Sequence, residues 1–247
     1  IAAGRMGRKE RVQRVLDEGV ADLVALGRPL LADHDLVEKW SRSEDQAVLQ
    51  CGYCLQGCLH RLKNGEPLGC NVNPELGLAE LEPSAQPKSV LVAGGGPAGM
   101  SAALYLSRRG HRVTLAESAD SLGGQFDLAW KAPGKEAMHG CLASLQRAVE
   151  TSSVQRMLQT TVGESLVREL RPDLLVWATG IGIQNLPEIP GLETQHALTS
   201  LDFFRENGEV KGPRVLVIGA GRVGLEIAEM LGRREFEVVA TKRTDPM

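Results

Sequence analysis

The chain has 247 residues, 43% of them hydrophobic, and a formal net charge of −3. A chain of this length and composition predicts two modest globular domains. The slight acidity argues against nucleic acid or an anionic membrane surface as the main partner. No apolar run reaches the ~18 residues that span a bilayer, and no secretory signal pattern opens the chain, so we expect a cytoplasmic protein.

Both ends of the sequence suggest a piece of a larger protein. The chain begins at Ile1 without an initiator methionine, and it ends at Met247 shortly after an expected strand. We therefore expect both the first and the last domain to be incomplete.

Residues 1–50 have the pattern of two strand–helix units. Apolar side chains at helical spacing predict a helix over 8–16. The short apolar run 22–26 predicts a buried parallel strand.

Two Gly-Arg pairs in this segment, Gly4-Arg5 and Gly27-Arg28, are candidates for phosphate contacts. Glycine permits a close backbone approach, and arginine can donate two parallel hydrogen bonds to an anion. Such a pair is a weak signal by itself, because a solvated loop arginine is its more common explanation.

Four cysteines follow in the order C-x2-C-x3-C-x11-C, at Cys51, Cys54, Cys58 and Cys70. Three thiols so close together can wrap one face of a metal cluster, and the distant fourth can close the other face. Zinc more often uses two C-x2-C pairs or cysteine with histidine, and disulfides are rare in the cytosol. The spacing therefore favours an all-cysteine 4Fe–4S cluster over structural zinc or a disulfide.

The segment 51–87 is interpreted as a cluster loop followed by a linker. Helical turns are expected over 55–62, and the Pro-rich stretch 82–88 is the clearest domain boundary. The fifth cysteine, Cys141, lies in a helical pattern over 136–149 and is expected to be a small buried side chain.

Residues 88–200 open with a dinucleotide-binding signature: strand, glycine-rich loop, helix and a second strand that ends in an acid. Gly94 is expected to make the tight turn, Gly96 to let the backbone approach a pyrophosphate, and Gly99 to let helix meet strand. The helix begins at Pro97-Ala98 and directs free N–H groups at the phosphate. Glu117 is placed to accept hydrogen bonds from a ribose. The expected elements are strands over 89–93 and 113–116 and a helix over 97–109.

These motifs occur in a characteristic order: the Gly-Arg pairs, the run 27–33, the cysteines, the segment 70–74 and the glycine-rich loop. In that order the chain resembles the C-terminal part of iron–sulfur flavoenzymes related to old yellow enzyme, of the 2,4-dienoyl-CoA reductase and trimethylamine dehydrogenase type. The resemblance implies that residues 1–50 end a flavin-binding (β/α)8 barrel whose Gly-Arg loops hold the FMN phosphate. It also implies that the earlier barrel strands, with the substrate-side acid and most of the FMN site, lie outside this chain.

Two later segments gain a role from the same resemblance. Gly124-Gln125 belongs to a Gly-Gly-Gln loop that is implied to lie near the flavin, with a plain surface turn as the alternative. A strand over 173–177 is expected to be buried, and it leads into Ala178-Thr179-Gly180, a turn implied to pass the nucleotide.

Residues 201–247 repeat the signature as the start of a second, truncated Rossmann-like domain. A strand over 214–218 is followed by Gly219, Gly221 and Gly224. A helix comes next, and a second strand over 238–241 follows that helix. Lys242 then stands where Glu117 stands in the first copy, with Arg243 beside it. Basic residues at this position accommodate the 2′-phosphate of NADP, so NADP(H) is favoured over NAD(H); a solvated charged turn is the alternative.

The resemblance implies an electron relay. NAD(P)H reduces FAD, single electrons pass through the cluster to FMN, and an unsaturated small molecule of the enoyl- or dienoyl-CoA class is reduced. In the alternative, an amine dehydrogenase, the first fold holds only ADP and electrons leave through the cluster to an electron-transfer flavoprotein. The intact second loop with Lys242 favours the reductase. A non-catalytic electron-transfer module is the third interpretation, and the substrate, the catalytic acid and the oligomeric state are left open.

Overall fold

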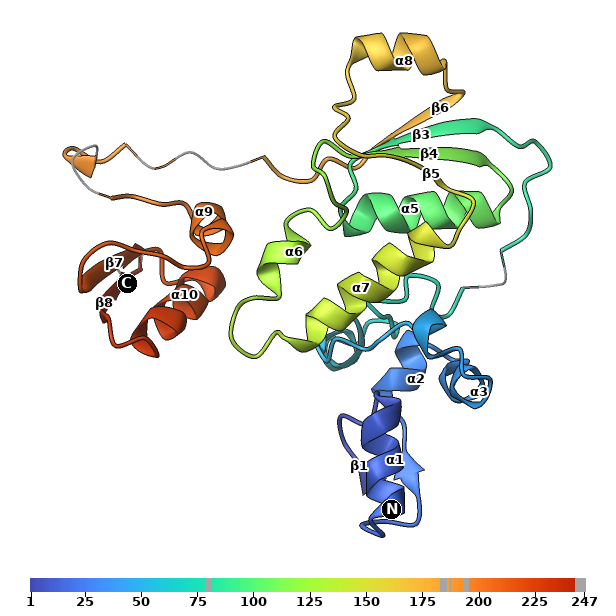
Figure 1. The fold of residues 1–247 in the computed structure, drawn as a ribbon, viewed down its shortest axis with the longest axis horizontal. Coiled ribbons are helices and arrows are strands. Elements are labelled where there is room, and N and C mark those ends of the chain that lie inside the picture. The colour runs from blue at the N-terminus through green and yellow to red at the C-terminus, as the bar shows by residue number, and fades with distance from the viewer. Residues whose placement is uncertain (79–80, 183–185, 187, 193–195, 243–247) are drawn as a thin grey trace. The chain divides into compact units, whose positions relative to one another are not determined.

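The computed structural model describes residues 1–78, 81–182, 186, 188–192 and 196–242. The chain forms two compact units, one of residues 1–126 and 137–180 and the other of residues 127–136 and 181–247 (Figure 1). None of the helices in the described ranges combines the length and the apolar character needed to cross a membrane.

The first unit begins with a small parallel pair of strands. Strand β1 (Ala2–Ala3) pairs with β2 (Val24–Ala25), and helix α1 (Lys9–Asp17) connects them. The helix agrees with the expectation, but the strand is shorter than 22–26 and is not buried, since Leu23 is 61% exposed. That part of the prediction is wrong because β2 has one neighbouring strand in the described structure, which leaves much of its apolar run uncovered. Short helical elements follow: α2 (Arg28–Ala32), α3 (Leu36–Ser41) and a 3-10 turn (Asp45–Ala47).

The cysteine-containing segment is irregular. Tyr53 and Leu55 have positive φ angles of 52° and 63°, which side chains rarely adopt. A π-helical turn (Gln56–His60) then runs into α4 (Arg61–Lys63), as the expected helical turns over 55–62 required. The chain reverses at Gly65, whose φ is 72°.

A four-stranded parallel sheet forms the centre of the first unit. Its order is β5-β4-β3-β6, and β3 lies between β4 and β6 because successive strands are added first on one side and then on the other. In Figure 1 the helices α5 and α7 lie on one side of this sheet and α8 on the other. This alternation of strand and helix is the Rossmann-like arrangement. The elements are β3 (Ser89–Ala93), α5 (Pro97–Arg108), β4 (Arg112–Ala116), α7 (Ala137–Glu150), β5 (Gln155–Met157), α8 (Glu164–Leu170) and β6 (Leu174–Trp177).

Burial differs sharply between the central strand and the edge strand. In β3, Val90, Leu91 and Val92 are almost fully buried, as expected for a strand covered on both faces. In β6, Leu174 is 41% exposed and Trp177 is 65% exposed. The strand expected over 173–177 exists, but its expected burial is wrong, because β6 lies at the edge of the sheet and pairs with β3 alone among the described strands.

The second unit contains one parallel strand pair and its connecting helix within the described ranges. Strands β7 (Arg214–Ile218) and β8 (Glu237–Thr241) pair in register, joined by α10 (Arg222–Gly232). Helix α9 (Ser200–Arg205) adds the rings of Phe203 and Phe204 to the core, where they meet edge to face at 5.4 Å. The short helix α6 (Phe126–Ala129) precedes the segment that contributes Ala132 to this core.

Candidate nucleotide and cofactor sites

Of the four glycines in the first glycine-rich loop, Gly94, Gly95 and Gly99 are crowded by their surroundings and Gly96 is not. Gly94 has a φ of 105°, and a Cβ there would collide with the carbonyl of Ala178. A Cβ on Gly99 would overlap the carbonyl oxygen of Gly94. At Gly96 a Cβ would meet no atom of the described residues within 4 Å, so the fold itself accepts a side chain there.

Helix α5 begins directly at this loop. Gly96 is its N-cap residue in extended backbone, and Pro97 occupies the first turn, where its missing N–H costs nothing. Helices leave their first N–H groups without intrahelical partners, so this end of α5 can bind an anion. Because β3 runs into the loop, the anion would lie at the C-terminal edge of the parallel sheet.

Glu117 is turned onto the loop. Its Oε2 accepts the N–H of Gly95 at 2.5 Å, and its Oε1 accepts the N–H of Ala119 at 2.9 Å and the hydroxyl of Ser118 at 3.0 Å. Partial burial raises the pKa of this carboxyl, but the hydrogen bonds together outweigh burial and hold the pKa below its usual value. The carboxylate is therefore ionised at neutral pH. Its bond to Gly95 was not foreseen from the sequence.

Two distant segments close around the same loop. The N–H of Gly123 donates to the carbonyl of Gly95 at 2.9 Å, and a Cβ on Gly124 would lie 3.2 Å from the Cα of Gly96. The N–H of Ala178 donates to the carbonyl of Ala93 at 2.8 Å, which brings Ala178-Thr179 beside Gly94. Gln125 and Gly180, the next residues of these two segments, are exposed. The structure thus brings the predicted nucleotide residues of the first unit together at one sheet edge.

The three-cysteine turn lies against the segment of the fourth cysteine. The N–H of Gly69 donates to the carbonyl of Gly57 at 2.9 Å. A Cβ on Gly57 would lie 2.8 Å from the Cα of Cys70, so only glycine allows this approach. All four predicted ligands are partly buried, and none of the five cysteines of the chain forms a disulfide.

The thiols influence one another electrostatically. Burial raises the pKa of Cys51, the N–H of Tyr53 lowers it by donating to its Sγ at 3.4 Å, and nearby Cys70 raises it again. Burial also raises the pKa of Cys141 to about 12, with further contributions from Cys51, Cys54 and Cys70. Cys141 is buried in α7, as predicted, and its Sγ donates to the carbonyl of Gln50 at 3.0 Å.

The cysteines are not arranged around a single point. Among the residues that the structure describes, no three or more His, Cys, Asp or Glu side chains are grouped so that they could hold a metal ion. A four-coordinate zinc would need its sulfurs about 4 Å apart, because each Zn–S bond is ~2.3 Å. A cluster bonds each thiolate to a different iron, so its ligands stand farther apart.

The two Gly-Arg pairs meet at an aromatic ring that sequence reasoning missed. The guanidinium carbons of Arg5 and Arg28 lie over Tyr53, at 5.6 and 5.4 Å from the ring centroid. Gly4 has a φ of 97°, which favours glycine, whereas at Gly27 a Cβ would meet no described atom within 4 Å. The available signal in the sequence was the presence of a tyrosine between two predicted ligands.

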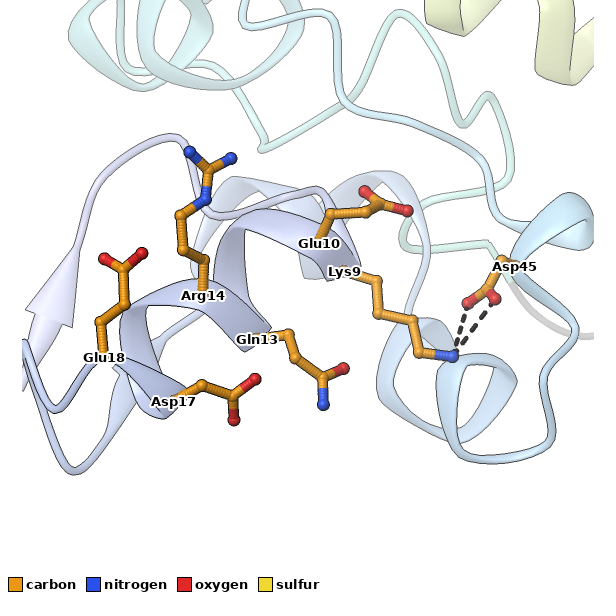
Figure 2. Close-up of a pocket in the computed structure, with 7 residues that line it drawn as sticks. All are labelled: Lys9, Glu10, Gln13, Arg14, Asp17, Glu18 and Asp45. Carbon is orange, nitrogen blue, oxygen red and sulfur yellow. Dashed lines mark hydrogen bonds and ion pairs between the residues drawn. The ribbon is translucent and has the colours of Figure 1, made fainter.

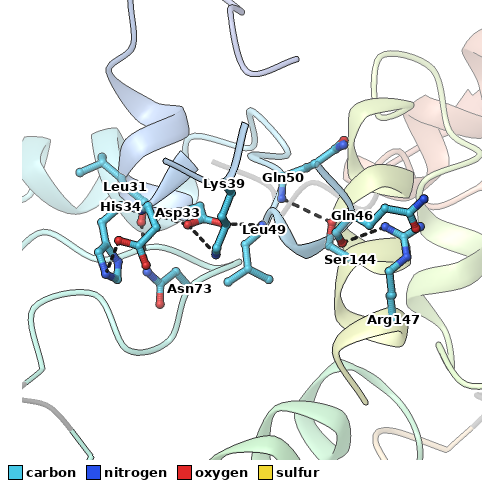
Figure 3. Close-up of polar contacts among 11 residues, drawn as sticks. Leu31, Asp33, His34, Lys39, Gln46, Leu49, Gln50, Asn73, Ser144 and Arg147 are labelled. Atoms are coloured by element: carbon cyan, nitrogen blue, oxygen red, sulfur yellow. Dashed lines mark hydrogen bonds and ion pairs between the residues drawn. The ribbon is translucent and has the colours of Figure 1, made fainter. Parts of the chain in front are cut away.

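Buried Asp33 organises the chain just before the cysteines (Figure 3). Its carboxylate, on a residue 3% exposed, accepts Lys39 Nζ at 2.8 and 2.9 Å and the N–H of Leu49 at 2.8 Å. Farther along, the N–H of Gln50 lies 3.5 Å from Ser144 Oγ in α7. These contacts fix the segment that leads into Cys51. They could not be predicted from the sequence, because they join residues that are not neighbours in the chain.

The second glycine-rich loop repeats the first in its backbone contacts. Gly219, with a φ of 104°, donates its N–H to the carbonyl of Thr241 at 2.9 Å, and the N–H of Ala220 donates to the same oxygen at 2.6 Å. A Cβ on Gly224 would overlap the carbonyl oxygen of Gly219, as at Gly99. Lys242 follows Thr241 directly and is exposed. Its predicted partner Arg243 lies outside the described residues.

A surface hollow is lined by residues that belong to none of these loops (Figure 2). It has a volume of about 580 Å³ and is lined by charged and amide side chains of α1, by Glu18 directly after it and by Asp45. Within it Lys9 Nζ forms an ion pair with Asp45 at 3.1 Å. Because its wall is the polar surface of one exposed helix, we assign it no chemistry.

Comparison with known proteins identifies the class of the chain. Residues 88–246, which contain both glycine-rich loops, match the pyridine nucleotide-disulphide oxidoreductase family, and the chain belongs to that family. The α/β fold with parallel sheets found here is the fold of a nucleotide-binding oxidoreductase.

Particular relatives extend over nearly the whole chain. It is 34% identical to bilirubin reductase of Mediterraneibacter gnavus over 96% of this chain and 37% of that protein. It is 37% identical to N,N-dimethylglycine/sarcosine dehydrogenase of Chromohalobacter salexigens over 73% of this chain and 27% of that protein. The structure of 2-naphthoyl-CoA reductase superposes with a TM-score of 0.86 and 29% identity, covering 96% of this chain and 36% of that one. The chain therefore spans well under half the length of the proteins that it resembles.

Proposed function

We propose that the chain is the electron-transfer part of an NAD(P)H-dependent iron–sulfur flavin oxidoreductase that reduces an unsaturated small molecule. The observation that carries this proposal is the convergence of Gly96, Glu117, Gly124 and Ala178 at the end of α5. Residues that follow three different parts of the sheet leave one glycine uncrowded at the N-terminus of α5, which is the arrangement that a dinucleotide pyrophosphate needs.

At the first loop we assign FAD, with ADP as the alternative. Gly96 would face the pyrophosphate, and the carboxylate of Glu117 would exchange its bond to Gly95 for bonds to the ribose hydroxyls. Family membership and the names of the relatives support an oxidoreductase but do not separate FAD from ADP. FAD is preferred because the second loop is also intact.

At the cysteines we assign a 4Fe–4S cluster held by Cys51, Cys54, Cys58 and Cys70. The close contact of Gly57 with Cys70 supports one shared site, and the C-x2-C-x3-C-x11-C spacing in the sequence favours a cluster over a single zinc ion. When bound, these groups would supply a relay in which hydride enters from NAD(P)H and single electrons pass through the cluster.

The remaining assignments concern the two ends of that relay. Arg5 and Arg28, with Gly4 and Gly27, would bind the phosphate of FMN, of which this chain holds only a part of the site. Lys242 would contact the 2′-phosphate of NADP(H) at the second loop. The substrate side, of the enoyl- or dienoyl-CoA class, would lie on parts of the protein outside this chain.

One relative supports a second function. The dehydrogenase of Chromohalobacter salexigens has the highest identity of the three relatives named above, although over a shorter stretch. In an amine dehydrogenase the same residues would carry electrons from FMN outward to an electron-transfer flavoprotein, and the first loop would hold ADP. Reduction of the bound flavin by a pyridine nucleotide separates the two functions, because only the reductase requires it.

The test uses the full-length protein prepared without oxygen. We expect about four iron and four sulfide per chain, the content of one 4Fe–4S cluster, and bleaching of the flavin absorbance on addition of NADPH. Cys58→Ser should lose iron, whereas Cys141→Ser, a matched change of a buried thiol, should keep it. Stoichiometric zinc without sulfide would refute the cluster. Bleaching of the flavin absorbance by a methylated amine such as dimethylglycine, but not by NADPH, would favour the dehydrogenase.

A further inference from the structure

Tyr53 touches both the arginine pair and the cysteine array. Its side chain lies under Arg5 and Arg28, and its backbone N–H donates to the Sγ of Cys51 at 3.4 Å. Neither contact belongs to the nucleotide fold, and neither follows from the cysteine spacing. The residue therefore connects two sites that were assigned on separate grounds.

The N-terminal segment also holds the ring in place. The phenol oxygen accepts the N–H of Gly7 at 3.0 Å. A Cβ on Gly7 would lie 2.7 Å from that oxygen, so the approach depends on glycine at this position. Pro29, next to Arg28, borders the same space. The tyrosine is thus fixed at its hydroxyl, its ring face and its backbone.

The backbone of this contact is conformationally unusual. Tyr53 and Arg5 both have positive φ angles, 52° and 53°. Such angles cost free energy for residues with side chains and persist only when their surroundings impose them. Here the surroundings are the ring, the two guanidinium groups and the sulfur of Cys51.

The charge of Arg28 also reaches the cysteine array. The guanidinium carbon of Arg28 lies 5.4 Å from the centroid of the Tyr53 ring, and the N–H of the same tyrosine donates to the Sγ of Cys51 at 3.4 Å. A positive charge this close to the sulfur would stabilise the more negative, reduced form of a cluster bound to it. An anion at the arginines would weaken that effect.

We propose that Tyr53 is a positioning residue that holds Arg5 and Arg28 as a pair for a phosphate group and couples occupancy of that anion site to the reduction potential of the cluster at Cys51. This inference rests on the proposed function, because it requires both the cluster and a phosphate ligand. Coupling of this kind is reciprocal, so the redox state of the cluster would change phosphate affinity by the same factor.

The first experiment measures flavin affinity in the full-length protein stripped of FMN. Tyr53→Leu removes the ring that attracts the guanidinium groups, and it should weaken FMN binding about tenfold. Riboflavin lacks the phosphate, so its affinity should change less than about twofold. Tyr53→Phe keeps the ring face and should retain most of the FMN affinity, which separates the role of the ring from simple loss of folding. The other tyrosine of the chain offers a matched control, Tyr105→Leu in α5, which should alter neither affinity.

The second experiment measures the cluster. In the FMN-stripped protein, saturating inorganic phosphate should lower the midpoint potential of the cluster in an EPR-monitored titration, and Tyr53→Leu should abolish that shift. A tenfold coupling corresponds to about 59 mV for a one-electron couple. Equal loss of FMN and riboflavin affinity in Tyr53→Leu, or a phosphate shift that persists in the variant, would overturn the proposal. Absence of cluster iron in the wild-type protein would instead refute the proposed function itself.

Discussion

The two glycine-rich loops have the same backbone but different surroundings. In the first, Gly94 donates its N–H to the carbonyl of Ala116 at 2.8 Å, and Glu117 follows. In the second, Gly219 donates its N–H to the carbonyl of Thr241 at 2.9 Å, and Lys242 follows. The last glycine of each loop is equally crowded by the carbonyl of the first. The repeated motif therefore determines how strand, loop and helix meet, and it does so in the same way in both copies.

The difference lies in what stands beside each loop. Around the first, Ala178 and Gly124 approach the backbone closely, and Glu117 bonds to Gly95. Around the second, a Cβ on Gly219 or Gly221 would meet no atom of the described residues within 4 Å. We therefore expect the motif to supply the backbone that contacts the phosphates of a nucleotide, and the neighbouring residues to determine which nucleotide each loop selects.

The largest effect on nucleotide affinity should come from adding a side chain to the uncrowded glycine of one loop at a time, Gly96 in the first or Gly221 in the second. Gly96→Val would place a side chain where the pyrophosphate must lie, and we expect ADP affinity at the first loop to fall at least about a hundredfold, or ~2.7 kcal/mol. The fold should lose no more than about 1 kcal/mol, the cost of a poorer N-cap residue.

Bound flavin and calorimetric ADP titration check this prediction. The matched variant is Gly221→Val, which should leave flavin content unchanged and abolish reduction by NAD(P)H. If both variants lost the same ligand, the two loops would not serve different nucleotides.

A somewhat smaller effect should appear in stability. Gly99→Ala forces the backbone of Gly94 and α5 apart, because a methyl group would overlap the Gly94 carbonyl, and overpacking of this kind costs about 2 kcal/mol. Gly224→Ala should cost a similar amount in the second unit. Chemical denaturation of each variant gives the free energy of unfolding, and a change below ~0.5 kcal/mol at either position would mean that the loop adjusts freely.

The residue that follows β8, Lys242, should determine whether the second loop prefers NADPH or NADH. Lys242 next to a 2′-phosphate should give NADPH an advantage of about tenfold over NADH, or ~1.4 kcal/mol. Lys242→Glu should reverse the order, since it repels the phosphate and offers NADH an acceptor for the ribose.

The ratio of kcat/KM for flavin reduction by the two coenzymes measures this effect. Lys211→Glu, three residues before the start of β7, changes the charge equally and should leave the ratio unaltered. Equal rates with both coenzymes in the wild-type protein would show that Lys242 does not contact the phosphate.

The smallest effect concerns pH and belongs to the first loop alone. Since the pKa of Glu117 is lowered in the folded protein, its carboxylate stabilises the fold above its unfolded pKa, near 4.5, and this stabilisation is lost as pH falls through the folded pKa. The group is in contact with solvent, which screens it, so we expect only a few tenths of a kcal/mol.

Unfolding of the wild-type protein and of Glu117→Gln at pH 7 and at acidic pH gives this contribution. The difference between the two proteins should shrink below pH ~4.5. A difference that is constant across pH would mean that the pKa of Glu117 is the same in the folded and the unfolded protein.

The sequence predicted these loops well because their signals are local. Gly94, Gly96 and Gly99 lie between a strand and the first turn of a helix, so spacing alone indicates their geometry. Exposure of β6 was missed, because a run such as Leu174–Trp177 looks the same in a central strand and an edge strand.

The contacts around the cysteines could not be predicted in the same way. Tyr53 meets Arg5 and Arg28, and Asp33 meets the N–H of Leu49, only after the chain has folded back on itself. The spacing of apolar residues along a helix or strand carries no information about such pairs. The cysteine spacing predicts a ligand set, but not the aromatic and acidic side chains that hold it.

The Pro-rich segment after the cysteines has a mechanical consequence. Ser84 donates its N–H to the carbonyl of Arg109 at 2.8 Å, and the guanidinium of Arg109 returns a bond to the carbonyl of Glu82 at 3.3 Å. The N–H of Lys88 donates to the ring of His111 at 3.0 Å. The composition of this segment suggests a flexible linker, but these hydrogen bonds attach it to the C-terminal end of α5. A force applied along the segment would therefore be transmitted to the helix and the sheet. Limited proteolysis should consequently spare the bonds between residues 82 and 88.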